Sequence, residues 1–469
     1  MGITRAKLVT ESAAMQLAGK KLQPVCARLL LLLAVLSVSA CGGGSAGGDI
    51  SQVEQQNSGS ANGSVGEAVP AKDMRVIATA EAKPYRPNAQ YASVLLDCMY
   101  VPDVESLCPF STLPYIGQTT DFVTVDDIMQ RVVATHDWMA VRMEEMLYRM
   151  PADLVQLFAP VTVIIIGSEV RPSSFTPALG LMRLDPFDLW LNDDERQTIS
   201  VADDPRTDFG SGLRFVGLSR VMLGDEYTSY FWPEDTERDH DLIEMPLARL
   251  LYHELGHAND YVQRNNMASL ANNLNPYLAI EQLSAFRVSA LLPADLSLTS
   301  PDAFFDGLAG VRYRDENPTA AHSIAQADSV GARMDNGGKV KFYSYSSPQE
   351  DVATLLETAM MKFHYDVDTH VAFANKPADE ENAGCNDYIV EWGVRNRLAS
   401  PLVTPRANFV VDKIMDESTA IDDFFANHIG QSVPLRQGDG WCDSRFATPS
   451  LSFGVRSKDS SWKVQPDFR

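Results

Sequence analysis

The sequence predicts an α+β protein, because helical and strand-like hydrophobic patterns occur in turn along the chain. Residues 125–150 carry apolar side chains at helical spacing and are followed by Pro151, which cannot continue a helix. Residues 161–166 form a continuous apolar run of the kind typical of a buried strand. Another helix is expected over residues 246–263, where leucines recur every three or four positions and Pro246 suits the first turn. Together these segments indicate a mixed fold.

The first forty residues have the composition of an export signal. Basic residues, Lys20 and Arg28 among them, precede an apolar run over residues 29–38, and small residues follow. The sequence Val-Ser-Ala-Cys that ends at Cys41 resembles the lipobox of bacterial lipoproteins, in which the cysteine is lipidated and becomes the new N-terminus. An ordinary signal peptide or an N-terminal membrane anchor is the alternative, although the apolar run is short for a bilayer core of about 30 Å. We therefore expect residues 1–40 to be a lipoprotein signal peptide and Cys41 to carry the lipid.

Residues 41–90 are expected to form a flexible tether. Their first part is rich in Gly, Ser, Asn and Gln and has too little apolar surface to fold. About thirty such residues would span on the order of 30 Å root-mean-square, which would hold the folded part clear of the lipid headgroups.

The charge of the chain argues against some classes of partner. The full sequence carries a net charge of −23. Residues 1–40 contribute five basic residues and one acidic residue, or +4, so the mature chain is near −27. Such an acidic chain is not expected to bind nucleic acid or anionic lipid surfaces.

Four cysteines remain after the signal and the lipid site are set aside, namely Cys98, Cys108, Cys385 and Cys442. In an exported, oxidising compartment these are expected to form two disulfides. Three pairings are possible. Pairing Cys98 with Cys108 and Cys385 with Cys442 is favoured, because each of these pairs lies in one region of the chain. Free or zinc-binding thiols are disfavoured, since the sequence contains no Cys-x-x-Cys.

The helix expected over residues 246–263 carries a metal-binding pattern. His253, Glu254 and His257 belong to the sequence His-Glu-Leu-Gly-His, and the i, i+4 spacing puts both imidazoles on one helix face, where they can reach one ion. Zinc is the expected metal, one per chain, with Glu254 placed to take the proton of a zinc-activated water. Two surface histidines are the alternative, but the surrounding leucines indicate a buried helix. Gly256 costs about 1 kcal/mol relative to Ala in a helix, so a neighbouring strand or the substrate is expected to approach it closely.

A third ligand is expected on a second helix, which opens with the segment Tyr343-x6-Glu350-x2-Ala353. Together with His-Glu-Leu-Gly-His, this segment resembles the catalytic domain of anthrax lethal factor and the related secreted Pro-Pro endopeptidases. The resemblance implies that Glu350 is the third zinc ligand. It also implies that the Tyr343 hydroxyl lies beside the reacting water, where it can hydrogen-bond the developing oxyanion. Tyr345 is the alternative for this role.

Other assignments of these residues stay open from the sequence. Glu350 is also the last residue of Ser347-Pro-Gln-Glu, which is a helix capping box. Glu281 and Asp260 are rival third ligands. Asp260 follows His257 by three positions, so we expect it to accept a hydrogen bond from an imidazole and fix its tautomer, or else to be a solvated residue at the helix end.

The resemblance further implies a zincin-like metallopeptidase fold, with an active-site helix and a second helix that carries the third ligand. Residues 91–375 would form the catalytic domain, with an N-terminal helical part, and residues 376–469 an extension packed on it. The expected protein is a gluzincin-like hydrolase of peptide or protein substrates. It would be exported and anchored to the bilayer of the cell envelope, periplasmic or outer-membrane, through its acylated cysteine. A non-catalytic zinc lipoprotein, acting as a binding or structural module, is the alternative.

Overall fold

The structure is a computed structural model. It describes residues 82–445 apart from 102, 104, 105, 201–205, 207, 229–235, 296–301 and 381. The predicted signal peptide, the predicted lipid-bearing Cys41 and residues 41–81 of the predicted tether lie outside the described residues. Within the described ranges, no helix is both long enough and apolar enough to cross a bilayer.

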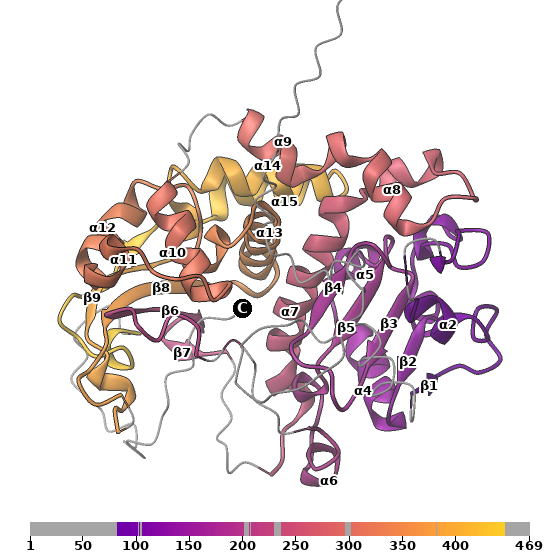
Figure 1. Ribbon diagram of the computed structural model, residues 1–469, viewed down its shortest axis with the longest axis horizontal. Coiled ribbons are helices and arrows are strands. Elements are labelled where there is room, and N and C mark those ends of the chain that lie inside the picture. The colour runs from indigo at the N-terminus through magenta and orange to yellow at the C-terminus, as the bar shows by residue number, and fades with distance from the viewer. Residues whose placement is uncertain are drawn as a thin grey trace, which may run out of the picture. The chain divides into compact units, whose positions relative to one another are not determined.

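The fold is mixed α+β, as the sequence predicts, with fourteen α-helices and two five-stranded sheets among the described residues (Figure 1). The first sheet has the strand order β1-β2-β3-β5-β4. Its strands are β1 (Lys83–Pro84), β2 (Val132–Ala134), β3 (Val163–Ile166), β4 (Ser174–Thr176) and β5 (Leu181–Leu184). β2, β3 and β5 are parallel, whereas the edge strands β1 and β4 run antiparallel to their neighbours. The chain therefore already forms sheet structure at β1, near the end of the stretch predicted to be a tether.

The prediction of one helix over residues 125–150 is wrong in its middle. Two helices occur there, α3 (Val125–Met129) and α4 (Asp137–Leu147), and β2 lies between them. All three residues of β2 are buried in the parallel part of the sheet. A strand that is buried on both faces loses the alternation of apolar and polar residues, so its apolar residues also fit helical spacing. The strand predicted over residues 161–166 is confirmed as β3.

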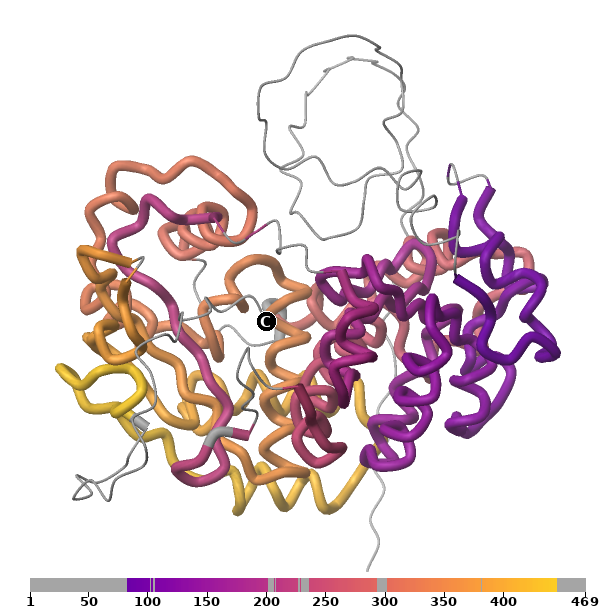
Figure 2. Tube along the Cα trace, turned by 90° about the horizontal axis from the view of Figure 1, so that it is seen from below, coloured from indigo at the N-terminus to yellow at the C-terminus, as the bar shows by residue number. Residues whose placement is uncertain are grey.

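The second sheet is antiparallel throughout, with the order β10-β9-β8-β6-β7. Its strands are β6 (Phe215–Leu223), β7 (Glu226–Tyr227), β8 (Asp368–Asn375), β9 (Val390–Arg395) and β10 (Val433–Pro434). β6 pairs with β8, which is distant in sequence, so in Figure 2 its magenta trace runs among orange and yellow segments. β9 and β10 follow residue 375, so the last part of the described chain completes this sheet.

The remaining helices include α7 (His240–Tyr261) and α13 (Pro348–Tyr365), which carry the candidate site. The others are α2 (Leu95–Met99), α5 (Ala152–Gln156), α6 (Asp193–Arg196), α8 (Pro276–Gln282), α9 (Val288–Asp295), α10 (Ala303–Tyr313), α11 (Ala320–Ile324), α12 (Ala327–Asp335), α14 (Thr404–Ile414) and α15 (Thr419–Asp423). A short 3-10 turn, η6 (Phe342–Tyr345), precedes α13. α7 and α13 pack directly against each other. The main apolar core joins them to the first sheet and α14, and a second core joins η6, α10 and α12 to the second sheet.

Both favoured disulfides are present. Cys98 is bonded to Cys108, and Cys385 is bonded to Cys442. The first pair closes a short loop at α2, and the second ties the turn η7 (Cys385–Asp387) to the residue before the turn η10 (Asp443–Arg445). The pairing predicted from proximity in the chain is therefore confirmed.

Candidate metal centre

The helix that carries the two histidines, α7, begins earlier than the sequence predicts. Asp239 caps its N-terminus by accepting a hydrogen bond from the Leu242 N–H at 2.8 Å. Pro246 therefore lies inside the helix rather than in its first turn. A proline there lacks one helical hydrogen bond, but Ile243 and Leu247 are buried on either side of it and anchor the helix through this turn.

His253 and His257 lie one turn apart on α7, with ring centroids 5.0 Å apart. His253 is buried and His257 is nearly so, with 13 % of its side chain exposed. The two rings are therefore not part of a solvated polar face. Both point toward α13, which supplies the next side chain of the centre.

Glu350 reaches the histidines from the first turn of α13. Ser347 is the N-cap of this helix, and its hydroxyl accepts a hydrogen bond from the Glu350 N–H at 3.0 Å. The carboxylate of Glu350 lies against His253, His257 and Tyr343. The capping box expected from the sequence is thus only half formed, because the backbone N–H of Glu350 serves the helix cap while its side chain lies against the histidines.

Three possible ligand atoms converge at this point. Glu350 Oε2 is 3.1 Å from His253 Nε2 and 3.3 Å from His257 Nε2. One atom from each of the three residues lies within 4.8 Å of the other two, so the group could hold a metal ion. In the described part of the chain, no second group of His, Cys, Asp and Glu side chains has this arrangement.

His253 and Glu350 stabilise each other's charge. Burial acts to lower the pKa of His253, but its hydrogen bonds with Glu350 and Glu357 raise it to about 9. Burial acts to raise the pKa of Glu350, but His257 and His253 hold it well below the usual range of a glutamate. A carboxylate kept ionised between two imidazoles is a site at which a cation can replace the imidazole protons.

Tyr343 lies beside the three candidate ligands. Its hydroxyl donates a hydrogen bond to Glu350 Oε1 at 2.9 Å, and its ring stacks on His253 with centroids 5.9 Å apart. Burial raises the pKa of Tyr343 well above its usual value, so its hydroxyl stays protonated and able to donate. Tyr345, the alternative for this role, instead stacks on Phe305.

Glu254 is a buried carboxylate next to the centre. It follows His253 on α7 and is 6 % exposed. Its negative charge contributes to the raised pKa of Tyr343. It also acts on Arg183 of β5. A carboxylate in this position is suited to proton transfer at the site.

Neither rival ligand, Glu281 or Asp260, belongs to the group of converging ligand atoms. Glu281 is 59 % exposed and lies 3.7 Å from Arg287. Asp260 is fully buried rather than solvated, and its Oδ1 accepts a hydrogen bond from the Ser289 N–H at 2.6 Å. Its Oδ2 has no hydrogen-bond partner among the described residues, and burial raises the pKa of this carboxyl to about 6. Asp260 thus joins α7 to the start of α9.

Three residues of the site were not predicted from the sequence: Glu357, which contacts His253, and Lys341 and Arg249, which pair with Glu357. Glu357 Oε2 is 3.1 Å from His253 Nδ1, and the same carboxylate lies 2.9 Å from Lys341 Nζ and 3.1 Å from Arg249 Nε. Burial acts to raise the pKa of Glu357, but Lys341, Arg249 and His253 hold it far below the usual range. A signal was available, since Glu357 follows Glu350 by seven positions and so lies two turns along the same helix face.

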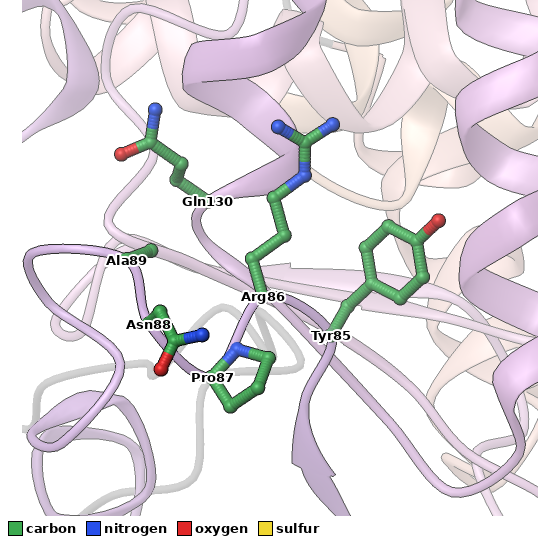
Figure 3. Close-up of a pocket in the computed structure, with 6 residues that line it drawn as sticks. All are labelled: Tyr85, Arg86, Pro87, Asn88, Ala89 and Gln130. Carbon is green, nitrogen blue, oxygen red and sulfur yellow. The ribbon is translucent and has the colours of Figure 1, made fainter.

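A surface hollow of about 510 Å³ lies apart from this centre (Figure 3). It is lined by Tyr85, Arg86, Pro87, Asn88, Ala89 and Gln130. Arg86, the charged residue of this set, is paired with Asp126 and Glu144. The Tyr85 hydroxyl also donates to Glu144, at 2.9 Å. The Arg86 and Tyr85 side chains are therefore already engaged within the protein.

No protein-family model, curated protein or solved structure matches this chain.

Proposed function

We propose that this protein is a zinc-dependent metallopeptidase. The observation that carries the proposal is the convergence of His253 Nε2, His257 Nε2 and Glu350 Oε2 on one point, with Glu254 and Tyr343 beside it. Catalytic zinc sites use three protein ligands and keep a fourth position open, whereas structural zinc sites are closed by four. Three ligands with an adjacent buried carboxylate correspond to the catalytic type.

Two of the three spacings between the ligand atoms match those around a tetrahedral zinc ion. With zinc–nitrogen and zinc–oxygen bonds of about 2.0–2.1 Å, neighbouring ligand atoms of a tetrahedron lie about 3.3 Å apart. The two separations from Glu350 Oε2, 3.1 Å to His253 and 3.3 Å to His257, agree with this value. Imidazole ligands favour zinc over calcium and magnesium, which prefer oxygen. The donor set therefore supports one zinc ion per chain.

The side chains around the ion have distinct tasks in peptide hydrolysis. Zinc, when bound, supplies a Lewis acid for the scissile carbonyl and for water. Glu254 takes a proton from the attacking water and passes it to the amine as the C–N bond breaks. Tyr343 donates a hydrogen bond to the oxygen that gains negative charge, for which its hydroxyl must leave Glu350 Oε1. Both side chains are buried, so their charges and hydrogen bonds act in a low dielectric.

The surroundings of α7 favour a peptide substrate. β4 is an edge strand of the first sheet, and it contacts α7. Edge strands offer main-chain N–H and C=O groups with which an extended peptide can pair. Two features support a zincin-like fold. The edge of a mixed sheet contacts the metal-binding helix, and a second ligand-bearing helix packs on that helix.

The proposed place of action is the cell envelope. The lipobox-like sequence that ends at Cys41 supports an exported protein held in the bilayer by an acylated cysteine, periplasmic or outer-membrane. The two disulfides support an oxidising compartment. The partners of such a protein are the lipid bilayer and a peptide or protein substrate.

The zinc content of the full-length protein tests the centre. One zinc per chain is expected in the wild type and in the control Glu281→Ala, which changes an exposed glutamate. A large loss is expected in Glu350→Ala, because two imidazoles alone hold zinc weakly. A wild type without zinc, or full zinc in Glu350→Ala, contradicts the proposed ligand set.

Cleavage of a broad peptide and protein library tests the activity. Glu254→Gln is expected to keep zinc and lose cleavage, because only the proton acceptor is removed. Cleavage at the wild-type rate in this variant contradicts the mechanism. A wild type that binds zinc but cleaves no member of the library supports the alternative of a non-catalytic zinc lipoprotein.

A further inference from the structure

We propose that Glu357 is a positioning residue of the metal centre, which holds His253 in the tautomer and orientation that bind the ion. This inference rests on the zinc site proposed above. Glu357 is 3 % exposed and lies on the face of α13 that also carries Glu350. Its Oε2 is 3.1 Å from His253 Nδ1, while Nε2 of the same ring lies 3.1 Å from Glu350.

Each nitrogen of the His253 ring lies beside a different carboxylate, Nδ1 beside Glu357 and Nε2 beside Glu350. An imidazole that binds a metal through Nε2 carries its proton on Nδ1, and a carboxylate that accepts a hydrogen bond from Nδ1–H fixes this tautomer. Glu357 is placed to accept that hydrogen bond. The bond also restricts rotation of the ring, so that Nε2 stays directed at the point shared with His257 and Glu350.

The neighbours of Glu357 keep it charged and fix its place. Lys341 Nζ is 2.9 Å from Oε2 and 3.2 Å from Oε1, and Arg249 Nε is 3.1 Å from Oε1. The Lys341 side chain is 2 % exposed, so the pair is buried, and loss of either partner leaves an uncompensated charge. Arg249 precedes His253 by one turn of α7, and Lys341 is the N-cap of η6, which carries Tyr343. The Glu357 carboxylate on α13 thus connects this helix with α7, through Arg249, and with η6, through Lys341.

Asp351 provides an internal comparison for Glu357. It lies on the same helix and is also 3 % exposed. Its cationic partners are Arg406 and, at 3.7 Å, Lys339. Within the described chain, Asp351 therefore shares the burial and ion pairing of Glu357 but makes no hydrogen bond to a histidine. Substitution of Asp351 reports what loss of a buried ion pair on α13 does without any change at His253.

The test uses full-length protein stripped of metal, with Zn²⁺ affinity measured against a competing chelator and the absorption spectrum recorded with Co²⁺. Glu357→Gln is expected to bind zinc about 10- to 100-fold more weakly and to shift the cobalt absorption bands, because a neutral amide is a weaker acceptor for Nδ1–H. Asp351→Asn is expected to lower the melting temperature and to leave both metal readouts at the wild-type values. A purely structural role of Glu357 would not separate the two variants in this way.

Glu357→Asp keeps the test decisive if the glutamine variant does not fold. It retains a negative charge beside Lys341 but withdraws the carboxylate from His253, so weaker zinc binding is again expected. Wild-type zinc affinity in a folded Glu357 variant, or an equal loss in Asp351→Asn, overturns the positioning role and leaves the zinc proposal intact. A wild type that binds no zinc overturns both.

Discussion

Gly256 on α7 packs directly against Ala353 on α13. A Cβ added to Gly256 would lie 3.0 Å from the Ala353 Cα and 3.4 Å from its Cβ. A close approach at Gly256 is predicted from the sequence and is confirmed. The expected neighbour was a strand or the substrate, whereas the structure shows the helix α13. These two small residues set the distance between the two ligand helices, and so the distance between the histidines and Glu350.

Enlarging Ala353 is expected to separate the ligands. Ala353→Leu overfills the contact between α7 and α13, which lowers the free energy of unfolding by about 1–3 kcal/mol and weakens zinc binding as Glu350 moves away. Chemical denaturation and a zinc titration against a chelator measure the two effects. The control is Ala140→Leu, the same change at a fully buried position of α4, which loses stability but keeps zinc affinity. Undiminished zinc affinity in Ala353→Leu would show that this contact does not set the ligand spacing.

The Tyr343 hydroxyl is expected to affect the rate and not the metal. Tyr343→Phe removes the donor but leaves a ring that can stack on His253, so kcat falls by about 10²–10³ while zinc content stays the same. Steady-state kinetics and metal analysis measure both quantities. Tyr345→Phe, a change at a similarly buried tyrosine, is the matched control and keeps the wild-type rate. Loss of zinc from Tyr343→Phe would mean that the tyrosine serves to hold Glu350.

His370 is expected to make the fold sensitive to acid. It is buried on β8, and its Nδ1 accepts a hydrogen bond from Arg220 Nε at 3.2 Å. Burial, with added repulsion from Arg220 and Arg395, lowers the pKa of His370 from 6.5 to about 2. The unfolded chain therefore takes up a proton below pH 6.5 that the folded protein excludes. The stability contributed by neutral His370 is complete above pH 6.5 and is lost as the pH falls toward 2.

This histidine alone should lower the free energy of unfolding by about 2 kcal/mol at pH 5, from about 1.4 kcal/mol for each pH unit below 6.5. The loss should disappear in His370→Gln. Comparing unfolding at pH 8 and pH 5 within each protein cancels any pH-independent cost of the substitution. If both proteins lose the same amount between the two pH values, the acid sensitivity arises elsewhere.

The two disulfides are expected to stabilise the fold by different amounts. Cys98 and Cys108 are separated by 10 residues, and Cys385 and Cys442 by 57. A longer closed loop restricts the unfolded chain more, which corresponds to about 3 kcal/mol for the shorter loop and about 4 kcal/mol for the longer. Replacing both cysteines of one pair by alanine and measuring denaturation gives each value. A larger loss for the shorter pair would contradict this loop-entropy argument.

The centre of the site was predictable because its parts are local patterns on helices. His253 and His257 belong to one five-residue sequence, and helical geometry alone places them on one face. Ser347 is a typical N-cap residue, so it predicts the start of α13 and the position of Glu350 in the first turn. Where the backbone conformation is fixed by neighbouring residues, the sequence is sufficient to predict which side chains point together.

Contacts between distant segments could not be predicted in this way. Glu357 lies 104 residues from His253, and the helical spacing that puts it on the same face as Glu350 does not show which residue of α7 it contacts. β2 has only three residues, and its burial depends on neighbours in the parallel sheet rather than on its own pattern. The start of α7 was missed because Pro246 looks like a first-turn residue unless the buried contacts before it are known. Each of these features is decided by tertiary packing.

Along the sequence, helices α8 to α12 come between α7 and α13, the two helices that carry the candidate ligands. His253 and Glu350 are 97 residues apart in sequence, yet their separation in space is set where α7 and α13 touch. Lengthening a connection costs little, about 0.6 kcal/mol for each doubling of a flexible loop. The surface turns between these helices can therefore lengthen at little cost while the contact between α7 and α13 stays the same. Divergence in size among proteins descended from this one should concentrate there.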